Sequence, residues 1–405
     1  MQRAERSWSK HYARLVTVVA LAHSATANAH GMPAGVTSVA AATTVGPNVV
    51  QVSEGLVQRI DGAWHYVCPV QFGNELTPPA HSIDGERTFV VGDSGLFVLE
   101  ANGSVTPQNR PEFSRQFVTG LGAAGQQLFA YRFENLRTEI REITATTASP
   151  IWFDDAAYDS ISTDDAGFWV ARTTPDGVGH ATRLDLLGAT VSEHTFVVEP
   201  GEAILRVMEF QDHLYVSTLT AGLTGRLTQL DANGIQTRVA DASAPIRGPV
   251  AVSTASAFFV ADGVLAALPG GAPAPTLMDR AACIGEVGGL VYLCSRTTLL
   301  GLDANGTTDV LLDLADLKGP LEGAASAESA DRCAVQWLVF QNDLRAIGAL
   351  PSPDAGDPDA SGTHASPAAS GCSITRRPTQ SRAGGLTLLV ALVALRIVRR
   401  VRVAR

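Results

Sequence analysis

Short apolar runs separated by Gly, Asn and Asp dominate residues 50–350, and no long segment has the three-to-four-residue spacing of an amphipathic helix. The runs are rich in β-branched and aromatic residues, which is typical of strands in antiparallel sheets. An aromatic residue recurs in these runs at intervals of 33 to 46 residues. The positions concerned are Phe89, Phe129, Trp169, Tyr215, Phe259, Tyr292 and Trp337.

A second repeated element follows the aromatic run in most copies. It consists of a leucine, an acidic residue and a glycine three positions after the acid, and three of the four copies contain Asn-Gly. The copies are Leu99–Gly103, Leu184–Gly188, Leu230–Gly234 and Leu302–Gly306. Because Asn-Gly favours positive φ at both turn positions, these segments are predicted to be tight hairpins.

A repeat of about 40 residues built from short strands and hairpins is the pattern of a β-propeller blade, whose apolar faces only neighbouring blades can cover. We therefore predict an all-β fold, a single six- or seven-bladed β-propeller over residues 50–350. Residues 55–68 are interpreted as two strands around an Asp-Gly turn, forming the outer edge of the last blade around Trp337 and closing the ring. A β-sandwich also has regular short strands and is the alternative.

Four cysteines lie in this body, and an even number in an exported protein favours disulfides. Cys283 and Cys294 bracket a segment that is interpreted as a hairpin. Cys68 and Cys333 then form the second pair, since they lie in the N-terminal strand and the last blade, which ring closure brings together. Zinc binding is the alternative, although the body has no Cys-x-x-Cys spacing.

The N-terminus has the order of parts of a secretory signal peptide. Basic residues precede a short apolar run at 15–22, and Ala27-Asn28-Ala29 supplies small residues where a signal peptidase cleaves. We predict a signal peptide over residues 1–29, cleaved after Ala29, because eight apolar residues are too few to span a bilayer, which takes about 20. Residues 30–49 are expected to be a flexible N-terminal segment.

The C-terminus is divided into a linker and a hydrophobic segment. Residues 351–372 are rich in Pro, Ala, Ser, Gly and Asp, so they are predicted to be a linker that buries no core. An apolar stretch over 383–395 follows, and the chain ends in a cluster of arginines. Because arginines are held on the cytoplasmic side, residues 373–405 are predicted to be a membrane-anchor helix with an Arg-rich tail.

This order of spacer, Gly371-Cys372, short apolar helix and arginine cluster resembles the MYXO-CTERM sorting signal of myxobacteria and their relatives. The resemblance covers about the last 35 residues. It implies that the tail is processed at Gly371-Cys372 and that the protein is attached to the outer surface of the cell. The polar segment 374–382 departs from the family pattern, so cleavage with lipidation and retention as a single-pass anchor both stay open. Either way the protein is expected at the cell surface, in the outer membrane or cell envelope.

The charge distribution bears on the class of partner. The formal net charge is −10, but the segment between the two ends holds 18 basic and 39 acidic residues, a net of −21. Such a body repels nucleic-acid phosphates, so nucleic acid is excluded as a partner.

Two motifs suggest catalysis at first sight. Gly92–Gly95 matches the tetrapeptide Gly-Asp-Ser-Gly around the nucleophile of trypsin-like proteases, and His81 precedes it. The tetrapeptide also joins two strand-like runs, which is typical of an ordinary turn. Residues 162–169 come near the Asp-box of sialidase-type propellers but have one residue too many before the glycine, so they are interpreted as a turn entering the strand of Trp169.

No catalytic, cofactor-binding or metal-binding residue is assigned, and no cofactor is expected. We expect a cell-surface-anchored propeller that acts as a binding or adhesion module for an extracellular protein or glycan, with the C-terminal tail in the membrane. An extracellular hydrolase or lyase, with a site built from loops at the propeller opening, is the alternative, since propellers host both functions. The side chains around the propeller axis are the observation that bears most directly on this choice.

Overall fold

The computed structural model describes residues 35–351, with gaps at 44–45, 75–76, 83, 125, 135–136, 145–148, 270–271, 274–279 and 321–326. The predicted signal peptide with its cleavage site at Ala29, the linker, Gly371, Cys372 and the predicted anchor lie outside these residues. Among the helices in the described part of the chain, none is both long and apolar enough to cross a membrane.

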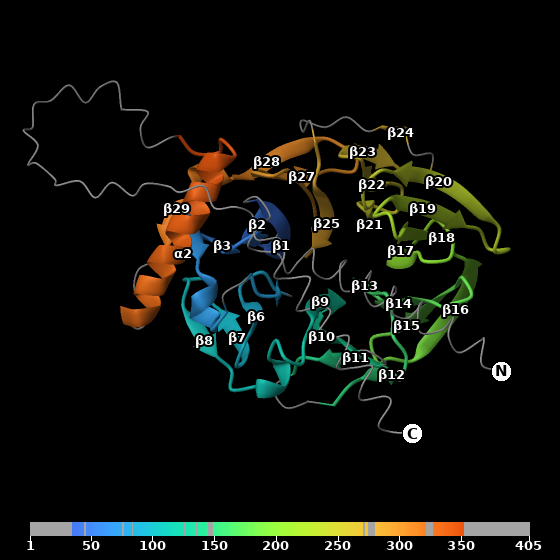
Figure 1. Ribbon diagram of the computed structural model, residues 1–405, viewed down its shortest axis with the longest axis horizontal. Coiled ribbons are helices and arrows are strands. Elements are labelled where there is room, and N and C mark those ends of the chain that lie inside the picture. Colours follow the sequence, from blue (N-terminus) through green and yellow to red (C-terminus); the bar gives the residue numbers. More distant parts are fainter. Residues whose placement is uncertain are drawn as a thin grey trace, which may run out of the picture. The chain divides into compact units, whose positions relative to one another are not determined.

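Seven sheets, one per blade, are arranged as a ring (Figure 1). The innermost strand of each blade contacts the innermost strands of the two neighbouring blades, in the order β1, β5, β9, β13, β17, β21, β25 and back to β1. These strands therefore surround the axis of the ring. The fold is an all-β, seven-bladed β-propeller, as the repeat predicts.

Each blade is built from consecutive strands, and the first gains one more from the C-terminal end. Blade 1 comprises β1 (Val36–Thr43), β2 (Gly46–Val52), β3 (Gly55–Ile60), β4 (Ala63–Val67) and β29 (Lys318–Pro320). Blade 2 comprises β5 (Ala80–His81), β6 (Thr88–Gly92), β7 (Gly95–Leu99) and β8 (Val105–Pro107). Blade 3 comprises β9 (Gly120–Ala124), β10 (Gln127–Glu134), β11 (Arg137–Glu142) and β12 (Trp152–Asp154). Blade 4 comprises β13 (Ser160–Asp164), β14 (Gly167–Thr173), β15 (Val178–Leu184) and β16 (Thr190–Val197).

The remaining blades follow the same plan. Blade 5 comprises β17 (Ala203–Phe210), β18 (His213–Leu219), β19 (Gly225–Leu230) and β20 (Gln236–Ala242). Blade 6 comprises β21 (Arg247–Ala251), β22 (Ala257–Ala261), β23 (Val264–Ala267) and β24 (Ala272–Pro273). Blade 7 comprises β25 (Cys283–Val287), β26 (Leu290–Cys294), β27 (Thr298–Leu302) and β28 (Thr308–Asp313). The helical elements are η1 (Pro69–Phe72), η2 (Pro111–Phe113), η3 (Leu314–Asp316) and α2 (Ala327–Ala346).

The connections between strands fall on two faces of the ring, because consecutive strands in each blade are antiparallel. The hairpin face carries the turns between first and second strands and between third and fourth strands. The linker face carries the turns between second and third strands and the links from one blade to the next.

The aromatic repeat marks the second strand of six blades, which confirms its interpretation. The residues are Phe89, Phe129, Trp169, Tyr215, Phe259 and Tyr292, in β6, β10, β14, β18, β22 and β26. Several fill the space between adjacent blades. Phe129 of blade 3, for example, lies edge-on to Phe168 of blade 4 with ring centroids 4.6 Å apart. Such pairs stabilise the blade interface beyond the apolar area that they bury.

The second repeat forms the turns between third and fourth strands, but its geometry differs from the expected one. Gly234 and Gly306 have φ of 76° and 80°, whereas the preceding asparagines do not adopt positive φ. The aspartate side chain stabilises the turn instead, because Asp231 Oδ1 accepts hydrogen bonds from the N–H groups of Asn233 and Ile235 at 2.9 and 2.8 Å. These are side-chain-capped loops rather than two-residue hairpins.

Blade 1 corrects the expected N-terminal boundary. The segment expected to be flexible, 30–49, contains β1 and the first half of β2, so the ring begins at Val36 rather than at residue 50. Residues 55–68 supply the third and fourth strands of this blade and do not belong to the last one. The inner strands bury Ala40, Ala41 and Val50 instead of an aromatic residue, so a search for aromatic anchors does not detect them.

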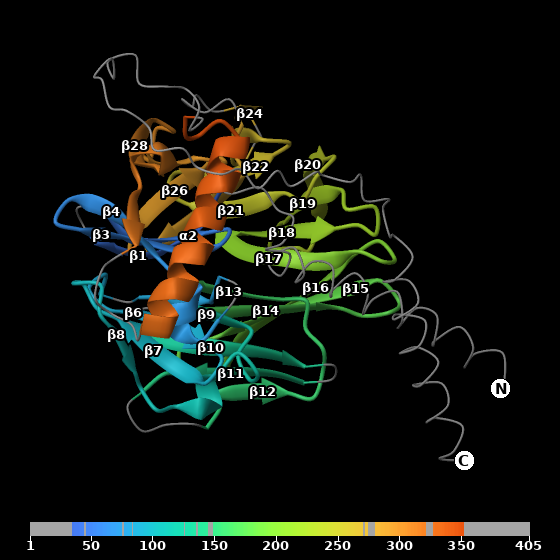
Figure 2. The ribbon, with the colours of Figure 1, turned by 60° about the vertical axis from the view of Figure 1, so that its left-hand side comes forward.

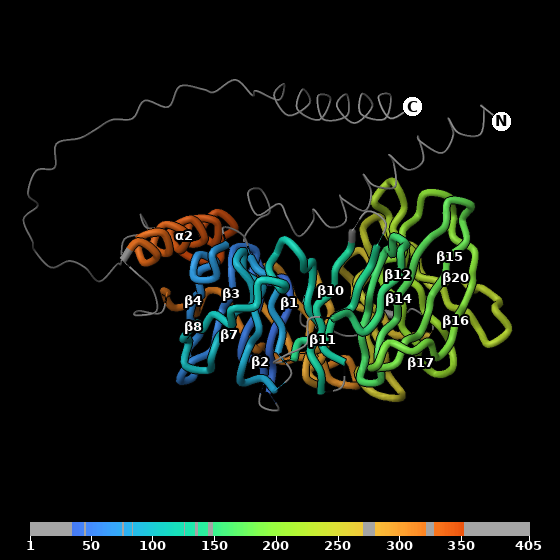
Figure 3. Tube along the Cα trace, turned by 90° about the horizontal axis from the view of Figure 1, so that it is seen from below, coloured from blue at the N-terminus to red at the C-terminus, as the bar shows by residue number. Residues whose placement is uncertain are grey.

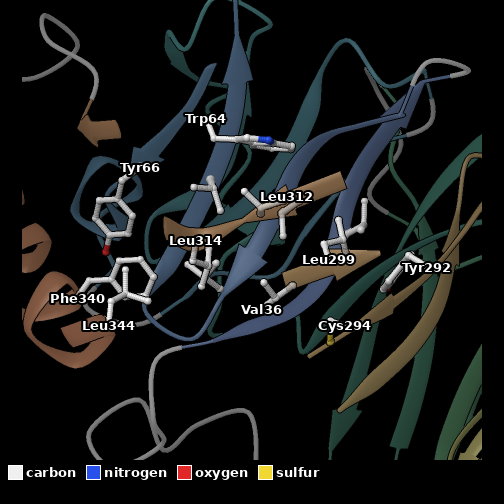
Figure 4. Close-up of a cluster of buried hydrophobic side chains, with 14 of the residues drawn as sticks. Val36, Trp64, Tyr66, Tyr292, Cys294, Leu299, Leu312, Leu314, Phe340 and Leu344 are labelled. Carbon is white, nitrogen blue, oxygen red and sulfur yellow. The ribbon is translucent and has the colours of Figure 1, made fainter. Parts of the chain in front are cut away.

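Trp337 corrects the expected last blade, because it lies in helix α2 and not in a strand. Cys333, Trp337, Phe340 and Leu344 are spaced by four, three and four residues, which places them on one side of a helix. That side packs in a cluster with Trp64 of blade 1, Leu312 of blade 7 and Leu314 of η3 (Figure 4). The ring centroid of Tyr66 lies 5.2 Å from those of both Trp337 and Phe340.

The segment that follows blade 7 packs against the outer edge of blade 1. Strand β29 pairs in parallel with β4 on the outer edge of blade 1, and α2 contacts both β29 and η1. Figures 2 and 3 show α2 beside the strands of blade 1, along one face of the ring. The ring therefore closes on its first blade.

Two disulfides join the pairs expected from the sequence. Cys68, directly after β4, is bonded to Cys333 of α2 with a Cα–Cα distance of 5.5 Å. Cys283 and Cys294 face each other across β25 and β26, 5.0 Å apart between Cα atoms. The first bond ties a helix to blade 1, whereas the sequence interpretation placed Cys333 in a strand of the last blade.

Candidate functional site

Three charged residues from blades 4, 5 and 7 lie near the axis of the ring. Asp165 lies in the turn between β13 and β14, Arg206 in β17 and Glu286 in β25. The charges of Asp165 and Arg206 both shift the pKa of Glu286. Because blades 5 and 6 separate blade 4 from blade 7, Asp165 and Glu286 interact across the axis, around which β13, β17 and β25 are arranged (Figure 1). We call these three residues the axial cluster.

Arg206 is the cation of the axial cluster. A bulge between Ile204 and Arg206 interrupts the pairing of β17 with β18 at this position. The side chain is half-buried, and its Nε is buried without a hydrogen-bond partner among the described residues. Burial lowers the pKa of Arg206, while Tyr292 and Glu286 act in the opposite direction. A guanidinium with an unused donor is suited to a carboxylate or another strong acceptor.

Glu286 is the titratable acid of the cluster. Its side chain is exposed to solvent, although many protein atoms lie around its carboxyl group. Desolvation by these atoms raises the pKa of Glu286, and the like charge of Asp165 raises it further, although the Gly289 N–H and Arg206 oppose the change. The Gly289 N–H donates to Glu286 Oε1 at 2.7 Å. Glu286 therefore keeps its proton to a higher pH than an ordinary glutamate does.

The Gly-Asp-Ser-Gly motif is a turn and does not form a pair with His81. Asp93 and Ser94 connect β6 to β7 on the linker face, whereas His81 pairs with Phe89 at the opposite end of β6. His81 Nδ1 lies 3.2 Å from the carbonyl oxygen of Ala40, which links blade 2 to blade 1. Burial lowers the pKa of His81, so the ring is neutral at physiological pH.

The segment that comes near an Asp-box is the hairpin between β13 and β14, as its interpretation as a turn predicts. Asp164 accepts a hydrogen bond from the Ala166 N–H at 2.8 Å and another from Arg183. Its neighbour Asp165 is the member of this hairpin that belongs to the axial cluster. The described residues include no group of three or more His, Cys, Asp or Glu side chains that could hold a metal ion.

Comparisons with known proteins show likeness in structure alone. No family model and no curated protein matches the sequence. Solved structures with similar architecture include the extracellular domain of BT4673 from B. thetaiotaomicron, at 13% identity and a TM-score of 0.44 over 66% of this chain and 38% of that one. A puromycin hydrolase has 16% identity and a TM-score of 0.40, over 72% of this chain and 60% of that one. A streptogramin B lyase has 11% identity and a TM-score of 0.39, over 64% of this chain and 89% of that one. The chain thus spans 38% and 60% of the length of the first two proteins, which is less than two thirds of each.

Proposed function

We propose that this protein is a cell-surface-anchored propeller that acts as a binding module for an extracellular protein or glycan, which it recognises at the axial cluster. The observation that carries the proposal is the Nε of Arg206 at the axis, which is buried and makes no hydrogen bond to any residue that the structure describes. An unsatisfied buried donor is costly, and a ligand acceptor would remove that cost. The two disulfides support export to an oxidising compartment.

The cluster defines what the ligand has to offer. Arg206 donates, so it takes a carboxylate or hydroxyl oxygen of the ligand. Glu286 and Asp165 take hydroxyl or amide donors from the same ligand, since both expose carboxyl groups. Because the side chains come from blades 4, 5 and 7, a ligand that contacts all three has to sit on the axis.

The test is the replacement Arg206→Ala in the full chain, with Arg59→Ala as the matched control on an exposed position of β3. Binding to an array of bacterial surface glycans and to immobilised outer-surface proteins is measured for both variants. Loss of a charge-assisted hydrogen bond of about 1.5–3 kcal/mol weakens binding by about tenfold to hundredfold in the Arg206 variant only. Equal binding by both variants would refute the axial site.

An extracellular hydrolase or lyase is the second candidate. The raised pKa of Glu286 beside the carboxyl group of Asp165 favours it, because an acid whose pKa is raised next to a second carboxyl group is an arrangement used in acid–base catalysis. Recovery of a bound glycan or peptide unchanged after prolonged incubation would support binding alone. Turnover that disappears in Glu286→Gln while binding persists would support the enzyme.

A further inference from the structure

A second polar site lies at the boundary of blades 5 and 6, on the linker face. It is a cavity of about 360 Å³ whose lining comes from four neighbouring segments. Thr220 and Thr224 belong to the loop before β19, Arg226 to β19, Asp241 and Ser243 to the end of β20 and its link, and Asp262 to the turn between β22 and β23. No residue of the axial cluster lines this cavity, so the two sites are separate.

Arg226 is the fixed cation of the cavity. Its Nη1 lies 2.6 Å from Glu199 Oε1 and 2.7 Å from Glu202 Oε1, and its side chain is 16% exposed. Glu202 is 3% exposed and also accepts a hydrogen bond from Thr218 at 3.1 Å. Carboxylates therefore hold the guanidinium in place on one side. Its Nε makes no hydrogen bond among the described residues and lies 3.6 Å from Asp241 Oδ1.

Asp262 is an acceptor held in place by the turn that carries it. It adopts φ of 50°, in the left-handed region that aspartate tolerates, and the turn presents it to the blade boundary. Its Oδ1 accepts both the N–H and the hydroxyl of Ser243, at 2.8 and 2.7 Å. These bonds occupy one carboxylate oxygen and leave the acceptor capacity of the other for a ligand.

Hydrogen bonds also fix the hydroxyl groups of Thr220 and Thr224 on the opposite wall of the cavity. Thr220 Oγ1 accepts the N–H groups of Gly222 and Thr224 at 3.2 Å each, and it lies 2.7 Å from Thr224 Oγ1. The Thr220 side chain thereby holds the loop from Thr220 to Thr224 in one conformation. The cavity presents preorganised donors and acceptors within a small volume.

The chemistry of this lining selects the class of ligand. Anions are disfavoured, since four carboxylates (Glu199, Glu202, Asp241 and Asp262) outnumber the two guanidinium groups of Arg226 and Arg238 near it. A cation is disfavoured by Arg226 itself, which lines the cavity. Hydroxyl groups both donate and accept, so a polyol satisfies carboxylate, guanidinium and threonine partners together. The volume is at the small end of ligand sites.

We propose that the cavity between blades 5 and 6 is a binding site for a neutral, polyhydroxylated ligand of monosaccharide size. Asp262 and Asp241 accept hydrogen bonds from sugar hydroxyls, and Arg226 donates to a sugar oxygen. This site works independently of the axial cluster.

The experiment is titration calorimetry of the full chain with neutral D-glucose, D-galactose and D-mannose, cationic D-glucosamine and anionic D-galacturonate. Asp262→Asn keeps the size of the side chain, and Asp231→Asn, on the hairpin face of blade 5, is the matched control. We expect at least one neutral hexose to bind, with affinity lowered fivefold or more in Asp262→Asn and unchanged in Asp231→Asn and Arg206→Ala. Thermal melting checks that each variant is folded.

Three results would overturn the proposal. They are the absence of binding by every neutral hexose, binding of only a charged sugar, and equal hexose affinity in Asp262→Asn and the parent protein. Loss of hexose binding in Arg206→Ala would also overturn it, because it would assign the sugar to the axis. Failure of the axial site alone leaves the hexose result intact, so the two proposals fail separately.

Discussion

The two disulfides offer a direct measurement of how the ring is held closed. One bond joins residues 265 positions apart, from blade 1 to α2, and the other joins residues 11 positions apart within one hairpin. Replacing each pair by alanines gives two variants that differ mainly in the length of the loop that is opened. The comparison therefore isolates the contribution of long-range closure.

The expected magnitudes follow from the entropy of the unfolded chain. Loop closure in the simple model removes about 5.6 kcal/mol of unfolded-state entropy for the 265-residue separation and about 2.8 kcal/mol for the 11-residue separation. The difference of about 3 kcal/mol depends only on the ratio of the loop lengths. It is expected to survive even if native-state effects reduce both absolute values.

The assay is guanidinium unfolding of the oxidised full chain and of the Cys68→Ala/Cys333→Ala and Cys283→Ala/Cys294→Ala variants, followed by tryptophan fluorescence. Non-reducing peptide mapping of the parent protein first verifies both pairs. The reasoning is refuted if opening the long loop costs no more than opening the short one, or if Cys68 and Cys333 are found as free thiols.

Three further predictions address the helix, the pH response and the anchor. Phe340→Ala removes a ring that is fully buried beside Tyr66, and it is expected to lower the free energy of unfolding by about 3–5 kcal/mol. Val335→Ala, on the exposed side of α2, is expected to lower it by less than about 0.5 kcal/mol. Similar losses in the two variants would contradict the packing of α2 on blade 1. Burial and Asp343 raise the pKa of Glu54 from its ordinary 4.5 to about 7, so stability from this group is full below pH 4.5 and lost as the pH rises through 7. Glu54→Gln is therefore expected to show a smaller fall in Tm between pH 5 and pH 8 than the parent, and parallel profiles would exclude this role. Deleting residues 373–405 is expected to release the protein from the cell surface into the medium, and cell fractionation that still finds it at the surface would rule out the predicted anchor.

The sequence predicts most of the ring, because six blades place an aromatic residue on the second strand, where it fills the space between blades. Blade 1 does not have an aromatic residue on its second strand. Its inner strands bury alanine and valine, and its aromatic residues Trp64 and Tyr66 lie on β4. The expectation of a strand at Trp337 is wrong because Gln-Trp-Leu-Val resembles the apolar centre of a strand. Its helical spacing with Cys333, Phe340 and Leu344 is the signal that would have revealed α2.

The axial cluster could not be predicted from the sequence. Asp165 precedes the aromatic anchor of its blade by four residues, Glu286 by six and Arg206 by nine, so no common offset marks them. Only ring closure brings these three blades together at one axis. The hairpin of Asp165 comes near an Asp-box in sequence, but that similarity predicts a turn and not the charge of the neighbouring side chain.

The pairing of β29 with β4 has a consequence for the order in which the protein matures. A chain emerges from the ribosome with its N-terminus first, so blade 1 is the first blade to be made. Its outer edge and the face of Tyr66 are covered only when β29 and α2 arrive, after all the other blades have been synthesised. A chain that stops short keeps an open strand edge and an exposed aromatic face, the features that lead to aggregation and to recognition by chaperones. Covering of blade 1 by β29 and α2 thus depends on synthesis of the whole ring.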